Sequence, residues 1–266
     1  MNGPRFRFCP TPAMNTTFEE LAGMIDHSLL HPSLTDAEAE AGCRLAAEYG
    51  VASVCVKPYF VARAAELLRG TPVRVGCVIG FPAGNSSTVV KVFETETACR
   101  DGAEEIDMVI NIGKALGGEW DYVEHEIRAV AEAAHRHGAK LKVIFENDYL
   151  PEDATKIRLC EICGRAGADW VKTSTGYGFV KQPEGGYDYR GATEHDLRLM
   201  RAHSPAHVQV KAAGGVRDLD GLLLVRELGC TRLGASATKA ILEEFKRRAA
   251  EGDMTAREAR LGSGGY

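Results

Sequence analysis

The sequence predicts an α/β fold, a closed (β/α)8 (TIM) barrel with a short N-terminal helix before its first strand. Apolar, β-prone runs alternate with helix-like runs eight times between Ile25 and Gly252. Alternating strands and helices indicate a parallel sheet. Eight such units in about 250 residues are typical of a closed barrel, and an open doubly wound sheet is the alternative. No GxGxxG follows the first strand and no GxxxxGK[ST] is present, which disfavours the nucleotide-binding versions of the open sheet.

Helix caps mark the start of the chain's first units. Thr16 or Thr17 caps the short first helix, because acidic residues follow in its first turn. Thr35 and Glu38 form a capping-box pattern that opens an alanine-rich helix ending near Gly50. Further helices are predicted at about residues 59–68, after residues 86–87 and after residues 117–118, and the first four strands at residues 24–30, 52–56, 73–79 and 105–110.

The same alternation continues in the second half of the chain. Pro151 introduces the fifth long helix, and Thr193 starts the helix that follows a long glycine-rich loop. The last helix runs to about Gly252. The strands predicted here are residues 140–146, a run that begins at residue 170, residues 208–212 and residues 231–235.

Composition and charge narrow the class of protein. The chain has 266 residues and a net charge of -5, which argues against nucleic-acid binding. No apolar run reaches the roughly 20 residues of a membrane span. Eight scattered cysteines indicate a reduced, cytoplasmic protein, and the CxxC pair Cys160 and Cys163 lies in a helix-like run without a second pair to complete a zinc site. We expect a loose extension over residues 1–15, one barrel domain over residues 16–252 and a flexible tail over residues 253–266.

Charged residues inside predicted strands are the strongest functional signal. A buried lysine is costly to keep charged, and Lys172 follows the apolar pair 170–171 directly. Active-site residues of barrels lie at the C-terminal ends of the strands. A salt bridge inside the barrel is the structural alternative for any one of these residues. The six candidates are Asp26, Lys57, Asp107, Glu146, Lys172 and Lys211.

Two lysines and an aspartate at equivalent strand ends suit an imine-forming aldolase. A neutral amine attacks an aldehyde, so its pKa must lie well below the usual value of about 10.4. A second ammonium group and partial burial lower that pKa. Lys172 is the predicted nucleophile, Lys211 the second ammonium, and Asp107 a proton shuttle that acts through a water molecule. This chemistry needs no metal and no cofactor.

Glycines near the last two strands predict a phosphate site. Gly214 and Gly215 precede the seventh helix, and residues 234–236 precede the eighth. Barrels often hold phosphate in these loops through backbone N–H groups and a helix N-terminus. Ordinary tight turns are the alternative interpretation of each glycine group.

The sequence closely resembles the 2-deoxyribose-5-phosphate aldolase family. The resemblance runs from about residue 20 to residue 250 in the family's order. It rests on Ile25-Asp-His-Ser-Leu-Leu30, Val54-Cys-Val56, Gly80-Phe-Pro82, Glu105-Ile-Asp-Met-Val-Ile-Asn111, Lys142-Val-Ile-Phe-Glu146, Val171-Lys-Thr-Ser-Thr-Gly176, Val210-Lys-Ala-Ala-Gly-Gly-Val-Arg217 and Arg232-Leu-Gly-Ala-Ser236.

The resemblance implies a role for each matching residue. Lys172 matches the Schiff-base lysine, Lys211 the lysine that lowers its pKa, and Asp107 the acid/base aspartate. A C-terminal tyrosine enters the site in some members, so Tyr266 is a candidate proton relay, with an unstructured tail as the alternative. The substrate-binding or supporting positions are Asp26, Cys55, Glu146, Gly176, Gly214, Gly215 and Ser236.

The reaction implied is the reversible cleavage of 2-deoxy-D-ribose 5-phosphate to D-glyceraldehyde 3-phosphate and acetaldehyde, in deoxyribonucleotide catabolism. The resemblance also implies a cytoplasmic dimer or tetramer without metal or cofactor. The chain departs from compact members in three places: a longer loop at residues 179–190, Ala237 where some members carry a serine, and an unmatched N-terminus. An aldolase with another aldehyde acceptor and a non-catalytic sugar-phosphate-binding barrel are the alternative functions.

Overall fold

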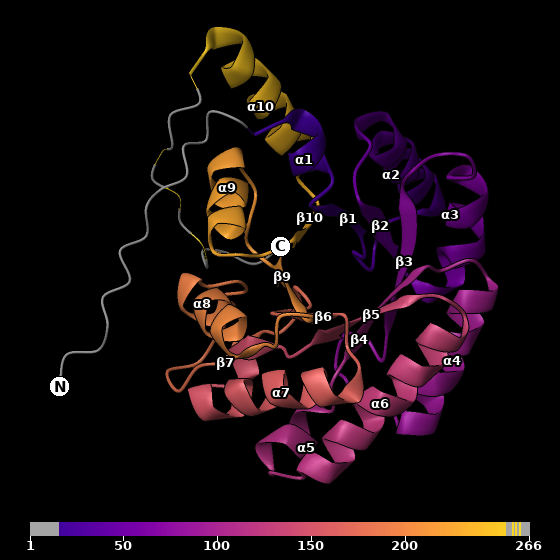
Figure 1. The fold of residues 1–266 in the computed structure, drawn as a ribbon, viewed down its shortest axis with the longest axis vertical. Helices are drawn as coiled ribbons and strands as arrows, with labels where there is room; N and C mark the ends of the chain where they lie inside the picture. The colour runs from indigo at the N-terminus through magenta and orange to yellow at the C-terminus, as the bar shows by residue number, and fades with distance from the viewer. Residues whose placement is uncertain (1–15, 254–256, 258, 260, 262–266) are drawn as a thin grey trace, which may run out of the picture.

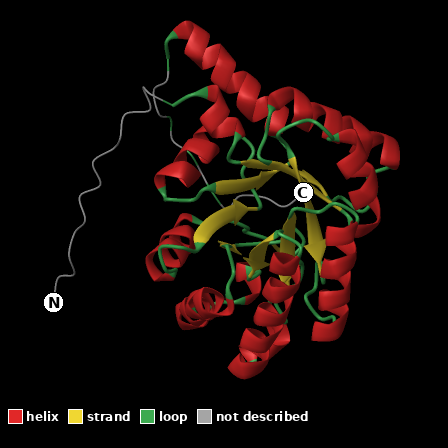
Figure 2. Cartoon of the chain, turned by 45° about the vertical axis from the view of Figure 1, so that its right-hand side comes forward, coloured by secondary structure: helices red, strands yellow, loops and turns green. Residues whose placement is uncertain are grey.

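The computed structural model describes residues 16–253, 257, 259 and 261. Eight parallel strands form a closed barrel in the order β1-β10-β9-β6-β5-β4-β3-β2, and helices surround it (Figures 1 and 2). The predicted (β/α)8 barrel is therefore confirmed. The barrel strands are β1 (Ile25–Leu29), β2 (Ser53–Val56), β3 (Arg74–Ile79), β4 (Glu105–Val109), β5 (Lys140–Ile144), β6 (Trp170–Lys172), β9 (Gln209–Ala213) and β10 (Arg232–Ala235).

Several helices begin at the predicted caps. Thr17 and Thr35 each accept a hydrogen bond from the backbone N–H three residues later, and a glutamate completes each capping box. The Thr193 side chain also accepts a hydrogen bond from the backbone N–H three residues later, at the start of the helix that follows it. The helices are α1 (Phe18–Ala22), α2 (Asp36–Tyr49), α3 (Val61–Leu67), α4 (Thr88–Arg100), α5 (Ile112–Leu116), α6 (Trp120–Arg136), α7 (Asp153–Ala166), α8 (Glu194–His203), α9 (Leu219–Glu227) and α10 (Thr238–Glu251), with short 3-10 turns at η2 (Pro58–Phe60) and η3 (Asn147–Tyr149).

The structure differs from the prediction in three loops after barrel strands. Helix α5 lies where a loop is expected, between β4 and α6. The predicted strand at residues 140–146 ends at Ile144, because Glu146 adopts a left-handed backbone with φ of 59° that cannot continue a strand. The long loop after β6 contains an antiparallel hairpin, β7 (Val180–Lys181) and β8 (Tyr187–Asp188).

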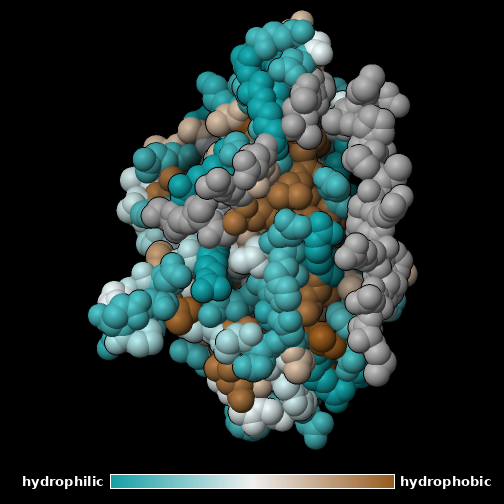
Figure 3. Space-filling view, turned by 90° about the vertical axis from the view of Figure 1, so that its left-hand side faces the viewer, coloured by the Kyte–Doolittle hydropathy of each residue, from teal (hydrophilic) through white to brown (hydrophobic). Residues whose placement is uncertain are grey.

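The hydrophobic core is the layer between the barrel and its helices. It is built from apolar residues of the barrel strands and of the inner helix faces, most of them fully buried. Figure 3 shows one face of the molecule, where hydrophilic residues cover most of the described surface and apolar residues gather toward the middle. None of the described helices is long and apolar enough to span a membrane.

A buried ion pair joins α4 to α6. Lys91 Nζ lies 2.8 Å from Glu126 Oε1, and it also donates hydrogen bonds of 2.8 Å to the carbonyl oxygens of Gly84 and Val109. Burial lowers the pKa of Lys91 and raises that of Glu126, so each charge depends on its partner. We expect Lys91→Met to reduce the free energy of unfolding by about 3–5 kcal/mol, because it leaves a buried carboxylate without its cation. Urea denaturation measures this change.

The matched control is the half-exposed pair of Arg128 and Glu124 on α6, whose charged atoms lie 2.9 Å apart. Arg128→Met should cost at most about 1 kcal/mol, because water solvates the remaining charge. An equally small effect of Lys91→Met would contradict the assignment of a structural role to the buried pair.

Candidate active site

Seven charged side chains meet inside the barrel. All of them are at least nine-tenths buried. They comprise three carboxylates and four cations, so the fully ionised cluster carries one excess positive charge. They are Asp26 on β1, Glu105 and Asp107 on β4, Lys142 on β5, Lys172 on β6, Lys211 on β9 and Arg232 on β10.

The register of the sheet explains why these residues meet. Lys172 pairs with Lys211 on the neighbouring strand, and Asp107 pairs with Lys142. Paired residues of neighbouring parallel strands point to the same face. The alternation of side chains along each strand and the register between strands therefore bring these charges together, although the strands lie far apart in the sequence.

Lys172 has the properties of an amine nucleophile. Its Nζ donates a 2.8 Å hydrogen bond to Asp107 Oδ2, and Lys211 Nζ lies 2.7 Å from the same oxygen. Burial lowers the pKa of Lys172, and the positive charge of Lys211 lowers it further, against the opposing effect of Asp107. A lowered pKa increases the neutral fraction of the amine, which is the form that attacks a carbonyl carbon.

Lys211 and Asp107 remain charged beside it. Burial alone would lower the pKa of Lys211, but Asp107 and Asp26, whose Oδ2 lies 2.6 Å from Nζ, raise it. Burial opposes ionisation of Asp107, but Lys142, Lys172 and Lys211 together hold its pKa well below the usual range. Asp26 behaves in the same way, with its pKa lowered by three neighbouring cations. The structure thus brings Lys172, Lys211, Asp107 and Asp26 together, as the sequence predicts.

Two cations of the cluster were absent from the predicted site. Lys142 Nζ lies 2.5 Å from Glu105, 2.9 Å from Asp107 and 3.1 Å from Asp26. Arg232 bridges Asp26 and Glu105, with 2.7 Å from Nη2 to Glu105 Oε1. Both lie inside predicted strands, Lys142 between two apolar residues and Arg232 directly before Leu233, and this placement was the signal available in the sequence. Lys142 thus contacts both carboxylates that bind Lys211, Asp26 and Asp107. Of these two carboxylates, Arg232 contacts only Asp26.

Removing Lys142 should destabilise the fold. Lys142→Met leaves three buried carboxylates with less compensation, so we expect a loss of about 3–5 kcal/mol in the free energy of unfolding. The matched control, Lys140→Met, changes a half-exposed lysine on the same strand and should cost at most about 1 kcal/mol. Urea denaturation of both variants is the measurement. Equal losses would mean that the position of the charge within the barrel is unimportant.

A small cavity opens above the cluster. Its volume is about 20 Å³, which is enough for about one water molecule. Lys172, Lys211, Cys55, Thr175 and Gly214 are among its lining residues. Burial raises the pKa of Cys55 to about 11, so its thiol stays neutral and limits the space without adding charge. The amine of Lys172 therefore faces a confined space of about the volume of one water molecule.

Glu146 supports this cavity from the side. It accepts hydrogen bonds from the Thr175 hydroxyl and from the Thr175 backbone N–H, the latter at 3.1 Å. Burial raises the pKa of Glu146 to about 7 despite these bonds. Its side chain also leaves no room for a Cβ on Gly178, which would lie 2.6 Å from the carboxyl carbon. Glu146 therefore holds the turn after β6 and does not line the cavity itself.

The predicted phosphate-loop residues lie at strand ends on the same side of the barrel. Gly176, Gly214 and Gly215 have φ values of 97°, 92° and 85°, which other residues rarely adopt. Ser236 is exposed directly after β10. Lys57 lies apart from the cluster, because its Nζ bonds to the Leu34 carbonyl oxygen at 2.8 Å. The candidate Tyr266 lies outside the described residues.

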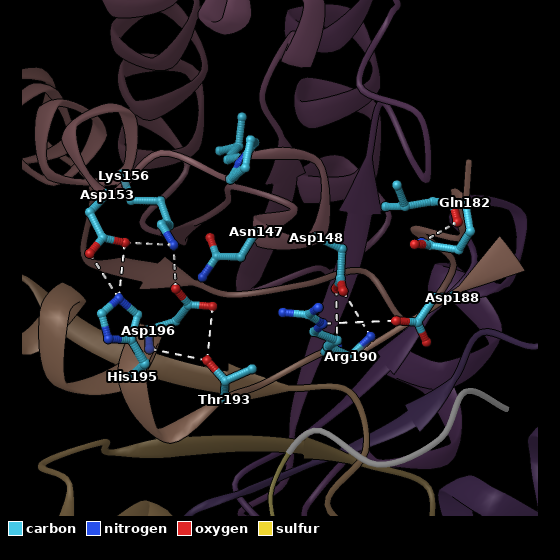
Figure 4. Close-up of a pocket in the computed structure, with 14 residues that line it drawn as sticks. Asn147, Asp148, Asp153, Lys156, Gln182, Asp188, Arg190, Thr193, His195 and Asp196 are labelled. Carbon is cyan, nitrogen blue, oxygen red and sulfur yellow. Dashed lines mark hydrogen bonds and ion pairs between the residues drawn. The ribbon is translucent and has the colours of Figure 1, made fainter. Parts of the chain in front are cut away.

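A larger cavity of about 510 Å³ lies outside the barrel mouth, between η3, the β7–β8 hairpin and the starts of α7 and α8 (Figure 4). Within the described part of the chain, the one group of carboxylate and imidazole ligands spaced to hold a metal lies here: Asp153, His195 and Asp196. Lys156 Nζ lies 2.5 Å from Asp196 and 3.1 Å from Asp153, so an ammonium group already compensates these carboxylates.

Comparison with known proteins decides the family. A sequence profile described as DeoC/LacD family aldolase matches residues 21–234. The chain belongs to the DeoC/LacD aldolase family. The buried lysine pair and aspartate therefore lie in an aldolase barrel, and the family resemblance deduced from the sequence is confirmed.

Individual relatives of this DeoC/LacD aldolase support the same family assignment. Deoxyribose-phosphate aldolase from Rhodopirellula baltica is 53% identical over 87% of this chain and 91% of its own length. The enzyme of the same name from Aciduliprofundum boonei is 45% identical over 85% of this chain and 97% of its own length. The tetrameric structure of deoxyribose phosphate aldolase from Aeropyrum pernix has a TM-score of 0.77 at 31% identity, covering 86% of this chain and 92% of that one.

Proposed function

We propose that the protein cleaves 2-deoxy-D-ribose 5-phosphate reversibly to D-glyceraldehyde 3-phosphate and acetaldehyde through a Schiff base on Lys172. The observation that carries the proposal is the contrast among the three lysines of the seven-charge cluster inside the barrel. The pKa of Lys172 is lowered, whereas those of Lys142 and Lys211 are raised. The names of the relatives support the substrate.

Covalent chemistry would begin at the aldehyde carbon of the open-chain sugar. The neutral Nζ of Lys172 attacks C1, and loss of water from the carbinolamine gives a protonated imine. The C3 hydroxyl then loses its proton and the C2–C3 bond breaks, so its electron pair forms an enamine and glyceraldehyde 3-phosphate leaves. Protonation of C2 and hydrolysis of the imine release acetaldehyde and regenerate the amine.

Proton transfer would rely on the charged neighbours of Lys172. Lys211 keeps a proton near neutral pH and can donate it toward the carbinolamine oxygen. Asp107 accepts hydrogen bonds from both lysines, which supports the role we assign to it, holding a water that moves protons to and from the substrate. The small cavity beside them limits the bulk water that would hydrolyse the imine early.

The phosphate group would bind away from the reacting carbons. The backbone N–H groups near Gly176, Gly214, Gly215 and the exposed Ser236 are the donors we assign to it. This assignment is supported by the position of these residues, which all follow the C-terminal ends of β6, β9 and β10.

Borohydride trapping tests the proposal. Acetaldehyde and sodium borohydride added to the whole protein should leave a reduced two-carbon adduct on Lys172, found by peptide mass spectrometry. An adduct confined to Lys211, or none at all, contradicts the assignment. A barrel that only binds sugar phosphates would also give no adduct, so the same experiment separates the non-catalytic alternative.

An aldolase with another aldehyde acceptor is the second candidate, and the hairpin after β6 favours it because it adds residues beside the mouth. Turnover of 2-deoxyribose 5-phosphate and of 2-deoxyribose separates the two. A strong preference for the phosphorylated sugar supports the first proposal, and equal turnover supports the second.

We also propose a cytoplasmic homo-oligomer. Cys43, Cys55, Cys77, Cys99, Cys160, Cys163 and Cys230 are free thiols in the described chain, as expected in a reducing compartment. On α4, Val89 and Phe93 are 77% and 65% exposed, which suits burial against a second subunit. Light scattering coupled to size-exclusion chromatography measures the mass, and a monomer would contradict the proposed assembly.

A further inference from the structure

Glu146 interrupts the pairing of β5 with β6. The N–H of Phe145, just before it, bonds to the Lys172 carbonyl oxygen at 3.0 Å, and the N–H of Asn147 bonds to the Thr173 carbonyl oxygen, also at 3.0 Å. The two donors stand two positions apart but their acceptors are consecutive, so Glu146 is the extra residue of a β-bulge. Among the described non-glycine residues, it alone has a positive φ. The bulge turns its side chain toward the loop after β6.

The carboxylate of Glu146 faces Thr175, which lines the cavity beside Lys172. It accepts hydrogen bonds from the Thr175 hydroxyl and from the Thr175 backbone N–H. The Tyr177 N–H donates to the Thr175 hydroxyl oxygen at 2.9 Å, which leaves the hydroxyl proton for Glu146. An ionised carboxylate offers an acceptor oxygen to each of the two donors of Thr175, whereas a protonated carboxyl group places a proton of its own among them.

The charge of Glu146 changes with pH in the neutral range. Burial raises its pKa to about 7, against the hydrogen bonds from Thr175, and the charge of Asp148 on η3 raises it as well. The positive charge of Lys172 lowers it. Tyr149 on η3 also faces Glu146, but burial and that carboxylate raise the pKa of its phenol, which therefore stays neutral. Glu146 is thus mostly ionised well above neutral pH and mostly protonated well below it.

We propose that Glu146 is a positioning residue whose ionised carboxylate holds Thr175 in the wall of the cavity beside Lys172. The inference rests on the proposed function, because it concerns the imine-forming reaction at that lysine. The turn is shaped around this carboxyl group, since a Cβ on Gly178 would lie 2.6 Å from its carbon. Protonation of Glu146 removes an acceptor and loosens the wall, so the reacting groups lose alignment although the nucleophile remains.

Glu146→Gln tests the inference, because its neutral amide imitates the protonated carboxyl group. The measurement is kcat/KM for cleavage of 2-deoxyribose 5-phosphate by the whole protein, on both sides of neutral pH. Dividing the value for the unmodified protein by that for the variant largely cancels the titration of Lys172, which both proteins share. This ratio should be close to one at low pH and should rise to roughly 10- to 100-fold at high pH. Its midpoint should lie at about pH 7.

Variants of Thr175 show whether Glu146 acts through it. Glu146→Gln should have much less effect in a Thr175→Val background, where the hydroxyl is already missing. It should keep its full effect in a Thr175→Ser background, which retains the hydroxyl. The matched control is a Thr173→Val background, because the Thr173 hydroxyl donates to the Ala213 carbonyl oxygen at 3.0 Å instead. Glu146→Gln should keep its full effect there too.

Two results would overturn the inference. A ratio that is the same at every pH means that Glu146 only packs the turn. Equal effects of Glu146→Gln in the Thr175→Val and Thr175→Ser backgrounds mean that it does not act through the Thr175 hydroxyl. Failure of the proposed function is seen separately, because the unmodified protein would then neither cleave the sugar phosphate nor form the acetaldehyde adduct on Lys172.

A second measurement applies if Glu146→Gln does not fold, as judged by urea denaturation. The Thr175 hydroxyl lowers the pKa of Glu146, so its removal in Thr175→Val raises that pKa. The step in kcat/KM near neutral pH should therefore move to higher pH in Thr175→Val and stay in place in Thr175→Ser. A step that does not move in Thr175→Val would equally contradict the role assigned to Glu146.

Discussion

Lys172→Ala should lower kcat for cleavage of 2-deoxyribose 5-phosphate by roughly four to six orders of magnitude, because no other amine can form the imine. Lys211 stays protonated beside Asp26 and Asp107 and cannot replace it. Lys172→Arg should be equally inactive, since it keeps the charge but not the nucleophile. Steady-state turnover measures the loss, and urea denaturation of each variant separates it from unfolding.

Lys57→Ala is the matched control for this loss. Lys57 lies at the end of β2 but outside the buried cluster, with its ammonium on a backbone carbonyl. We expect its turnover to stay close to that of the unmodified protein. Substantial turnover by Lys172→Ala, or an equal loss in Lys57→Ala, would rule out Lys172 as the single nucleophile.

Lys211→Leu should reduce kcat by roughly 100- to 10,000-fold near neutral pH, because it removes both a proton donor and the ammonium group that lowers the pKa of Lys172. Without that positive charge, the effect of Asp107, which favours the protonated form of Lys172, meets less opposition. The pKa of Lys172 therefore rises, and the neutral fraction of the amine at neutral pH falls.

The pH dependence of borohydride trapping follows from this rise in the pKa of Lys172. The rate of imine formation rises with pH through the pKa of Lys172, so its midpoint should move to higher pH in Lys211→Leu. Lys211→Arg keeps the positive charge and should leave the midpoint nearly in place. A midpoint that stays unchanged or moves to lower pH in Lys211→Leu would contradict the electrostatic role assigned to Lys211.

Much of the fold was predictable because its signals are local. The capping boxes at Thr17 and Thr35 and the alternation of strand and helix depend on neighbouring residues only. The β7–β8 hairpin was not predictable, because strands of two residues have no periodicity. The early end of β5 comes from the left-handed backbone of Glu146, which the loop contacts of its carboxylate stabilise and no local pattern predicts.

The centre of the site was predictable for a different reason. Lys172, Lys211 and Asp107 are charged residues at the ends of predicted strands, and a closed barrel brings such ends together. Lys142 and Arg232 pair with Asp107 and Lys211 in the sheet, and their role depends on which carboxylates they meet inside the folded barrel. Tyr189 packs against Gly214 only in the folded hairpin. Asp148 holds this segment by accepting hydrogen bonds from the backbone N–H groups of Arg190 and Gly191.

The burial of the seven-charge cluster determines how dissolved salt acts on the protein. Mobile ions screen exposed charges over about 8 Å at physiological ionic strength, but they do not enter a packed barrel interior. The pKa of Lys172, which buried neighbours set, is therefore insulated from the salt content of the surroundings. Salt should compete instead at the loops to which we assign the phosphate group of the proposed substrate. We therefore expect ionic strength to change the binding of the proposed sugar phosphate and to leave the reactivity of the amine nearly constant.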